Sequence, residues 1–282
     1  MSMIFVAGLT GPVRDAVIDA LAKQGAAVAA GPDGTNAPAG VAVRAFDFDD
    51  QASMAAAMAG CDRLFLAPPF CETMARAGSR AVAAAREAGV SYIVLASRYD
   101  ASSDAHWRMG REFGMVEQFV EDSGIPFTVL RANTPMQKFT GLLADAVRSG
   151  RVPLPEESHP VSYLDARDVA ACAVRLLLDS EGHENRFYAL TGPEGLTGAD
   201  AAARLSDALG RAVAYEAIEE EPFIEGLDAA GYTEWQRNME VSLSRVVKLG
   251  MMGNVTGAVE YLTGAPARTF AEFAAEHAAT WK

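Results

Sequence analysis

Short apolar runs alternate with amphipathic stretches through the first half of the chain. Six runs have the length and composition of buried strands: residues 4–7, 26–30, 41–48, 64–67, 92–96 and 127–130. Between them, apolar residues recur at helical spacing in four stretches: residues 14–24, 50–58, 72–88 and 107–123. Apolar strands separated by helices indicate a parallel sheet that is covered on both faces. We therefore predict an α/β fold with a doubly wound, Rossmann-like parallel sheet.

The pattern loosens after about residue 150. Helices are expected at residues 165–178 and 197–209, strands at 187–190 and 213–217, and mostly helix from 219 onward. We interpret residues 1–150 as a dinucleotide-binding domain. Residues 151–282 are predicted to form a smaller α/β substrate-binding lobe at the carboxyl edge of the sheet, with segments crossing between the two.

The first strand leads into a glycine-containing turn, Gly8-Leu9-Thr10-Gly11, followed by a helical pattern. Such glycines permit a tight turn and a close approach of the backbone to a pyrophosphate at the helix N-terminus. Arg14 stands where the third glycine of a G-x-x-G-x-x-G motif is expected. Its side chain has two alternatives: it extends into solvent, or its guanidinium contacts a phosphate of the cofactor.

Composition narrows the class of partner. Half of the 282 residues are hydrophobic, 22% are charged, and the net charge is −13, which argues against a nucleic-acid surface. No apolar run approaches the roughly 18 residues of a membrane span. Three scattered cysteines and four histidines lack metal-ligand spacing, so we expect no metal, reduced thiols and a cytoplasmic location. A small molecule is the expected partner, and a homodimer through the C-terminal helices is an alternative to ordinary packing there.

Several ordered motifs resemble a known family. They are Gly8-Leu9-Thr10-Gly11 and residues 46–50, 64–69, 130–133, 161–170, 190–193 and 262–270. Taken together, the chain resembles the NmrA-like group of atypical short-chain dehydrogenases/reductases. The family contains quinone, imine and enone reductases as well as cofactor-sensing regulators without turnover. The resemblance therefore implies an NAD(P)-binding Rossmann fold more firmly than it implies one activity.

The resemblance also implies cofactor-binding positions, with NADP as the expected cofactor and NAD as an alternative. The pyrophosphate loop corresponds to Gly8, Thr10, Gly11, Pro12 and Val13, to which we add Arg14. Further positions follow along the carboxyl edge of the sheet: Asp47 and Phe48 beside the adenine, Ala67, Pro68 and Pro69 beside the nicotinamide ribose, Ser97 after the next strand, and Asn133 near the nicotinamide.

The residues at the end of the second strand do not decide between NADP and NAD. Many dinucleotide-binding folds place there an Arg for the NADP 2′-phosphate or an acid for the NAD ribose. This chain has Gly31 and Pro32, and the nearest acid is Asp33. Asp33 is either a ribose ligand or an ordinary turn residue.

The usual catalytic pair of short-chain dehydrogenases is missing. No tyrosine has a lysine four residues later, and the His and Glu that replace this pair in many NmrA-like members correspond here to Phe113 and Glu117. Tyr99 is our candidate for a proton or hydrogen-bond donor, with a surface loop residue as the alternative. The remaining candidates for substrate binding, each competing with simple packing, are Phe70, Thr134 and Met136.

Three functions fit these residues. The leading one is an NAD(P)H-dependent oxidoreductase that reduces a small conjugated or aromatic substrate such as a quinone, enone or imine, with biosynthetic tailoring as an expected role. Such a reductase depends more on the orientation of its substrate against the nicotinamide than on a proton donor supplied by the protein. The alternatives are a non-enzymatic NAD(P)-sensing regulator and a cofactor-free enzyme on a degenerate reductase scaffold.

Overall fold

The computed structural model describes residues 2–8, 11–31 and 38–282. They form two compact units. The first consists of residues up to His106 with Gly110–Arg131 and Val169–Ala189, and the second of Trp107–Met109, Ala132–Asp168 and Leu190–Lys282. The two units thus interleave along the chain; the sequence predicts a division near residue 150 with segments crossing between the two parts.

The first unit is built on one sheet, which has seven strands in the described part of the chain, in the order β3-β2-β1-β4-β5-β6-β8. The strands are β1 (Met3–Ala7), β2 (Ala27–Ala30), β3 (Val41–Val43), β4 (Arg63–Leu66), β5 (Tyr92–Arg98), β6 (Phe127–Ala132) and β8 (Arg186–Leu190). The pairs β3-β2, β2-β1, β1-β4 and β4-β5 are parallel. The predicted doubly wound fold is confirmed.

Two strand predictions differ from the structure. The run 41–48 was expected to be one strand, but β3 ends at Val43. The ring of Phe46 packs on Phe5 and edge-on against Phe48. The run 187–190 was assigned to the second lobe, but β8 lies beside β6 in the large sheet.

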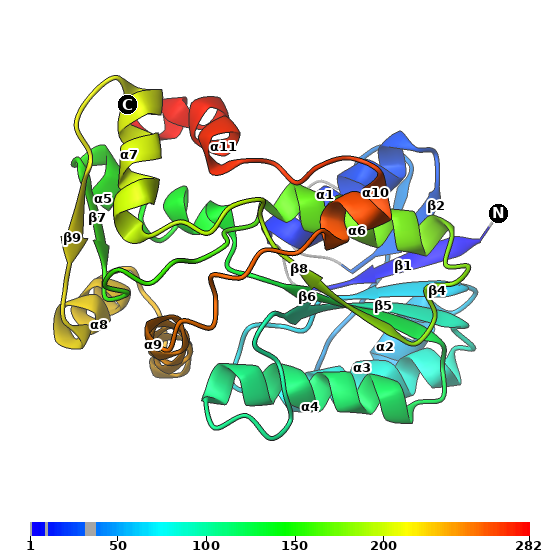
Figure 1. Cartoon of the computed structure of the whole chain (residues 1–282). Helices are drawn as coiled ribbons and strands as arrows, with labels where there is room; N and C mark the ends of the chain where they lie inside the picture. The colour runs from blue at the N-terminus through cyan, green and yellow to red at the C-terminus, as the bar shows by residue number, and fades with distance from the viewer. Residues whose placement is uncertain (1, 9–10, 32–37) are drawn as a thin grey trace. The chain divides into compact units, whose positions relative to one another are not determined.

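Helices cover both faces of this sheet (Figure 1). On one face lie α1 (Pro12–Lys23) and α6 (Ala166–Leu178), and on the other α2 (Gln51–Met58), α3 (Met74–Glu87) and α4 (Arg108–Asp122). Apolar side chains of β1, β4 and β5 meet those of α2, α3 and α4 in one core cluster, which includes Phe5, Leu66, Leu95 and Val116. Burial of this cluster holds the strand ends at fixed positions.

The order of the strands creates a switch point. The chain moves from β1 outward to β2 and β3 and then returns to β4 on the other side of β1. Gly8 and Ala67, which follow these two strands, meet there, and the amide of Ala67 donates to the carbonyl of Ala7 at 2.8 Å. Ligands of open α/β sheets bind outside the carboxyl ends of the strands at such a point.

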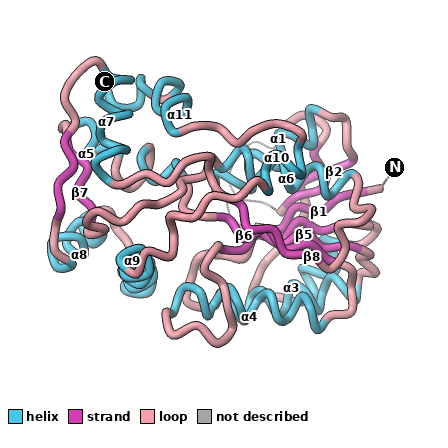
Figure 2. Tube along the Cα trace, in the orientation of Figure 1, coloured by secondary structure: helices cyan, strands magenta, loops and turns pink. Residues whose placement is uncertain are grey.

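The second unit combines a small sheet with short helices. Its strands β7 (Arg151–Leu154) and β9 (Ala214–Ala217) pair in parallel and lie side by side in Figure 2. Its helices are η1 (Met136–Phe139), α5 (Ala144–Arg148), α7 (Gly198–Leu209), α8 (Glu220–Ala229), α9 (Glu234–Lys248), α10 (Ala258–Thr263), α11 (Phe270–Glu276) and η2 (Ala278–Trp281). The rings of Phe139, Tyr163 and Phe270 form its buried aromatic centre.

Asp165, expected at the start of a helix, caps α6. Its buried carboxylate accepts the amide of Arg167 at 2.8 Å, the Arg167 side chain at 2.7 Å and the amide of Gln137 at 3.1 Å. Burial is the largest single influence and raises the pKa of Asp165, but the contacts with Arg167 and Gln137 together hold that pKa below its usual value of 3.8.

The Asp165→Asn variant is therefore expected to lose stability in a pH-dependent way. Because the folded-state pKa is lowered, the ionised carboxylate stabilises the fold above about pH 4, and this contribution is lost as the pH falls through the folded-state value. We expect a cost of roughly 1–3 kcal/mol at pH 7 that shrinks by pH 3. Urea unfolding of both proteins at the two pH values measures it. A difference that is constant with pH would contradict the role of the charge.

Candidate functional site

The turn after β1 presents a helix N-terminus at the switch point. The N-cap residue of α1 is Gly11, which offers no side-chain hydrogen bond, and Pro12 occupies the first turn. A Cβ on Gly8 would lie 3.1 Å from the Cβ of Ala67 and 3.2 Å from its carbonyl oxygen, so the end of β4 favours glycine there. Amides of the first turn, including that of Val13, are thus not occupied by an N-cap side chain, which suits an anion. The predicted contact of Thr10 lies outside the described residues.

Arg14 lies inside the first unit. Its side chain is only 3% exposed, Nη2 donates to the carbonyl oxygen of Gly31 at 3.0 Å, and Nη1 lies 3.1 Å from a carboxylate oxygen of Asp15. The alternative in which Arg14 extends into solvent is therefore wrong. Instead, the guanidinium reaches from the third-glycine position to the carboxyl end of β2. Pro32 and Asp33, the other candidates at this strand end, lie outside the described residues.

The segment after β3 holds the two residues predicted beside the adenine. Asp47 is exposed, and its carboxylate accepts the amide of Asp49 at 2.8 Å. Phe48 is 9% exposed and packs edge-on against Phe46, with ring centroids 4.8 Å apart. Phe48 thus belongs to the core, and the contact of Asp47 and Phe48 with an adenine stays a prediction.

The next candidates follow β4. Ala67 and Pro68 are half-buried, Pro69 is buried, and Phe70 is half-buried. Two consecutive prolines lack backbone donors and have fixed φ angles, so they give this strand end a rigid, apolar surface. Their predicted place beside the nicotinamide ribose is not tested by the geometry.

Polar residues gather after β5. Tyr99 is half-buried, between Arg98 and Asp100, whose side chains lie 3.4 Å apart. Ser97 is 5% exposed, and its hydroxyl donates to Glu117 of α4 at 2.5 Å. The carboxyl end of β5 therefore carries two hydroxyl groups in different settings, one half-buried and one bonded to a buried carboxylate.

Glu117 is bound from two sides. Besides the Ser97 hydroxyl, it accepts Nε and Nη2 of Arg131 at 3.0 and 2.6 Å, and its side chain is 4% exposed. The Arg131 guanidinium also stacks over the ring of Phe187 at 4.7 Å. The sequence identified Glu117 by its place on the helix but missed Arg131, since the two are 14 residues apart and meet only through the packing of α4 on the sheet.

Three predicted residues belong to the second unit. The side-chain amide of Asn133 donates to Ser162 Oγ at 2.7 Å and to the carbonyl of Met252 at 2.9 Å, and its oxygen accepts the amide of Thr134 at 2.7 Å. Asn133 therefore fixes the local chain path. Thr134 is 2% exposed, and its Oγ1 has no hydrogen-bond partner within the described residues. Met136 is 1% exposed. Their contacts with cofactor or substrate stay predictions.

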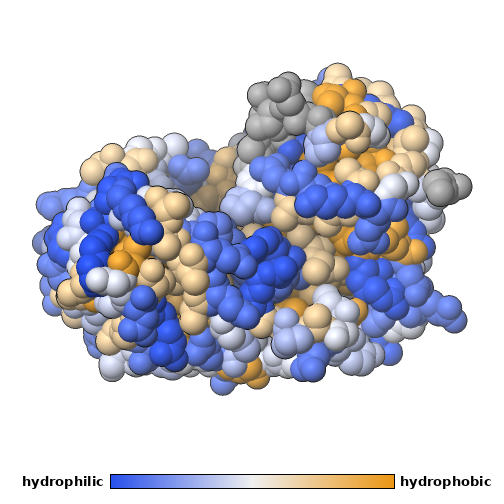
Figure 3. Space-filling model, turned by 90° about the horizontal axis from the view of Figure 1, so that it is seen from above, coloured by the Kyte–Doolittle hydropathy of each residue, from blue (hydrophilic) through white to orange (hydrophobic). Residues whose placement is uncertain are grey.

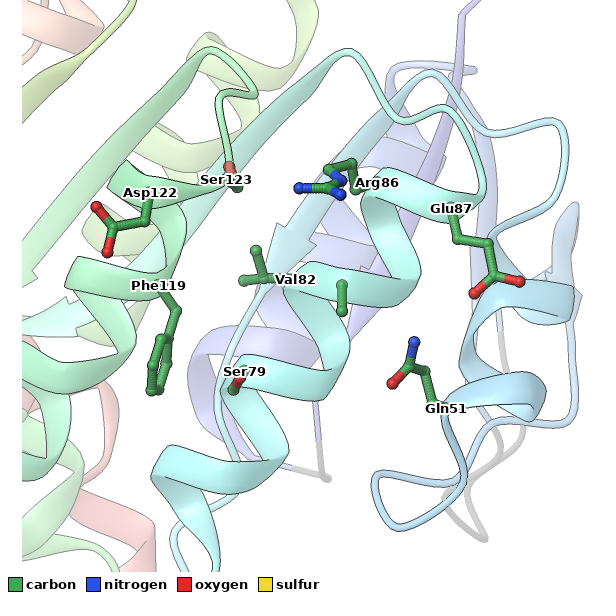
Figure 4. A pocket seen from close by; sticks show the side chains of 9 residues that line it. Gln51, Ser79, Val82, Arg86, Glu87, Phe119, Asp122 and Ser123 are labelled. Carbon is green, nitrogen blue, oxygen red and sulfur yellow. The ribbon is translucent and has the colours of Figure 1, made fainter.

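Two surface pockets of the first unit lie among its helices. One, of about 480 Å³, is lined by α3 and α4 with Gln51 at the start of α2; Figure 4 shows Val82 and Phe119 with the charged ends of Arg86 and Asp122. The other, of about 310 Å³, is lined by polar residues that include Glu117 and Arg131. None of the predicted cofactor or substrate residues lines either of them, so we do not assign the predicted site to these pockets.

The described residues contain no group of three His, Cys, Asp or Glu side chains that could hold a metal ion. None of their helices is long and apolar enough to cross a membrane. Figure 3 shows hydrophilic and hydrophobic residues interspersed on the face that it draws. Exposed apolar side chains of the second unit include Leu249 and Tyr261. The homodimer expected from the sequence stays a prediction.

The sheet order and the uncapped glycine turn define a Rossmann-type α/β protein. A family model described as the NmrA-like family matches residues 1–250. The chain belongs to the NmrA-like family, as the motifs in the sequence indicate.

Relatives that are named as reductases or oxidoreductases cover most of the chain. A protein named "NAD(P)H azoreductase" from Xenophilus azovorans is 35% identical over 86% of this chain and 84% of its own length. A Streptomyces griseus protein named "(4-alkanoyl-5-oxo-2,5-dihydrofuran-3-yl)methyl phosphate reductase" is also 35% identical, over 98% of both chains. The crystal structure of the NADPH-dependent quinone oxidoreductase QOR2 from Escherichia coli, complexed with NADPH, has a TM-score of 0.83 and is 25% identical, covering 97% of this chain and 99% of that one.

Proposed function

We propose that this protein is an NAD(P)H-dependent reductase of small conjugated or aromatic molecules. The observation that carries the proposal is the switch point, where Gly8 packs against Ala67 and α1 begins without a side-chain cap. Such a site favours a dinucleotide. The names of the relatives, an azoreductase, a dihydrofuran phosphate reductase and a quinone oxidoreductase, agree with it.

The residues of the first unit fit NADP(H), with NAD(H) as the weaker alternative. The turn from Gly8 through Gly11 and the first turn of α1 would hold the pyrophosphate. Arg14 at the end of β2 would face the 2′-phosphate, because guanidinium groups bind phosphate through paired N–H donors. The reduced nicotinamide would supply a hydride, and the rigid segment Ala67–Pro69 would limit where its ring can lie.

Conjugated acceptors suit a site without a Tyr-x-x-x-Lys pair. A quinone, enone, imine or azo group spreads the charge that a hydride brings, so its reduction depends mainly on orientation and exclusion of water. Phe70 would stack on such a substrate, and the hydroxyl of Tyr99 would hydrogen-bond to it while the proton comes from water or from Tyr99 itself.

Activity and binding assays test the proposal together. Fluorescence titration with NADPH and NADH measures cofactor affinity, and the absorbance of NADPH follows turnover over a panel of quinones, enones, imines and azo dyes. We expect binding of NADPH and turnover with at least one class of acceptor. Binding without any turnover would instead favour the cofactor-sensing regulator. Absence of binding would favour cofactor-free chemistry.

The Tyr99→Phe variant is expected to retain the NADPH dissociation constant and to lower kcat about 10- to 100-fold, because it removes one hydroxyl donor and nothing else. Steady-state kinetics with the best acceptor measures the change. Tyr261→Phe, at a tyrosine that is 71% exposed, is the matched control and should match the wild type. Unchanged turnover in Tyr99→Phe would eliminate the Tyr99 hydroxyl from the reaction.

A further inference from the structure

Arg98, the last residue of β5, has a guanidinium that is only partly used within the first unit. Its Nε donates to a carboxylate oxygen of Asp100 at 3.4 Å, and the Asp100 side chain is 1% exposed. The other N–H donors of an arginine are on the terminal nitrogens Nη1 and Nη2. No hydrogen bond joins either of them to another described residue, and Nη2 is buried. The guanidinium is thus held at one nitrogen while the two terminal nitrogens have no acceptor in the described part of the chain.

Unused donors of this kind are uncommon in a folded protein. The Arg98 side chain is only 15% exposed, so its donors have little access to water. A buried donor without an acceptor destabilises the fold, because its hydrogen bond to water is lost and not replaced. A guanidinium that keeps such donors is therefore a candidate for contact with a ligand that comes from outside the chain.

The fold places this guanidinium at the carboxyl edge of the sheet. Leu95 of β5 pairs with Leu66, the last residue of β4, so Arg98 lies beyond the end of that neighbouring strand. Side chains alternate along a strand, and Leu95 belongs to the core shared with α3 and α4. Arg98 therefore stands on the opposite face, which α1 and α6 cover (Figure 1). The uncapped start of α1 lies at the same edge, where ligands of such sheets bind.

A fixed cation at this edge suits a reaction that creates negative charge. In the reduction of an enone by NADPH, a hydride forms a C–H bond at the β carbon and leaves NADP⁺. The π electrons move to the carbonyl oxygen, and the resulting enolate takes a proton from water at its α carbon. A quinone or an azo group likewise gains charge on oxygen or nitrogen. Charge-assisted hydrogen bonds from a preorganised donor stabilise that charge.

We infer that Arg98 is a catalytic hydrogen-bond donor whose terminal N–H groups stabilise the negative charge that hydride transfer places on the acceptor. The inference rests on the proposed function, since it requires hydride transfer at this edge of the sheet. Arg98 supplies a permanent charge and no proton, because a guanidinium stays protonated in proteins, and this distinguishes its role from that of Tyr99. The preferred substrates are therefore neutral acceptors that become anionic, rather than iminium cations, which a hydride neutralises.

The first test compares acceptors of different charge in Arg98→Met, which removes every N–H donor of the side chain and keeps an apolar stem. We expect kcat to fall about 100- to 1,000-fold with menadione and 2-cyclohexenone, the usual effect of losing a charge-stabilising donor. With the N-methyl-3,4-dihydroisoquinolinium cation, hydride transfer removes a charge instead of creating one, so kcat should stay close to that of the wild type. The NADPH dissociation constant should not change.

Two further variants separate chemistry from folding. Arg98→Lys keeps a cation beside Asp100 but lacks the planar fork, so it should retain the fold and lose at least about tenfold in kcat with the neutral acceptors. Arg86→Met, at an exposed arginine of α3, removes a charge elsewhere on the first unit and should match the wild type with every acceptor.

A binding measurement tests the charge without turnover. When 4-nitrophenol ionises in the complex with NADP⁺, its oxygen carries a negative charge as the enolate oxygen does, and its absorbance reports the ionised form. In the wild type the bound phenol should ionise at a pH about one unit lower than in Arg98→Met, because a nearby guanidinium favours the anion.

Equal losses of kcat with neutral and cationic acceptors, or a bound nitrophenol that ionises at the same pH in both proteins, would overturn the catalytic role. A higher KM confined to acceptors that bear a carboxylate, with kcat retained, would overturn it in favour of substrate recognition. These outcomes are distinct from a failure of the reductase proposal, in which the wild type itself binds NADPH and reduces no acceptor, and both proposals are then wrong.

Discussion

Arg14→Ala is expected to weaken NADPH binding about 10- to 100-fold while changing the affinity for NADH less than threefold. The guanidinium of Arg14 donates a hydrogen bond to the carbonyl of Gly31 and therefore lies at the end of β2. Dinucleotide-binding folds recognise the 2′-phosphate at this strand end. A charge-assisted bond to phosphate is worth about 1.5–3 kcal/mol, which corresponds to that range. Fluorescence titration with both cofactors measures the two affinities.

The comparison of the two cofactors separates the possible roles of Arg14. A contact with the pyrophosphate, which both cofactors share, would weaken them equally and would rule out the 2′-phosphate assignment. Arg14→Gly restores the third glycine of the motif and should show the same selectivity. Arg76→Ala removes a charge from a side chain of α3 that is 59% exposed, so it controls for long-range electrostatics and should change neither affinity.

Gly114→Ala is expected to lower the unfolding free energy by about 3 kcal/mol. A Cβ at Gly114 would lie 2.1 Å from the carbonyl carbon of Ser102 and 2.2 Å from the amide nitrogen of Ser103, which are backbone atoms of the loop after β5. The loop must then move away from α4, and overpacking of this kind typically costs 1–3 kcal/mol, occasionally more. Thermal unfolding should show a decrease in Tm of roughly 6–12 °C.

A second helical glycine supplies the control. Gly226 lies in α8 with no atom within 4 Å of an added Cβ, so Gly226→Ala should raise stability by about 0.5–1 kcal/mol through helix propensity alone. Destabilisation by both substitutions would point to a general cost of alanine. A Gly114→Ala protein as stable as the wild type would show that the loop does not require close contact with α4.

The repeating pattern predicted the first unit well. Apolar runs with period-two or fully buried character become β1, β2, β4, β5 and β6, because such segments have few alternatives to a covered parallel sheet. The pattern failed at residues 44–48 and at β7. Residues 44–48 mix polar and apolar side chains, but the rings of Phe46 and Phe48 pack with each other and with Phe5 after the strand has ended. The strand β7 is short and exists through its pairing with β9.

The candidate site was only partly visible in the sequence. The glycine turn and the family motifs identify positions near Gly8 and Gly11, because the backbone geometry of a nucleotide turn restricts residue types locally. The sequence allowed two directions for the Arg14 side chain, and its burial of all but 3% decided between them. No local signal links Ser97, Glu117 and Arg131, which come from three different elements.

The sequence by itself determined the fold class, the place of the nucleotide turn and the absence of a Tyr-x-x-x-Lys pair, because these depend on neighbouring residues along the chain. The tertiary structure alone decided where Arg14 points, what holds the Ser97 hydroxyl and why Gly114 must lack a side chain. Those features depend on atoms that are distant in sequence and are brought within hydrogen-bond or van der Waals distance only when the core packs.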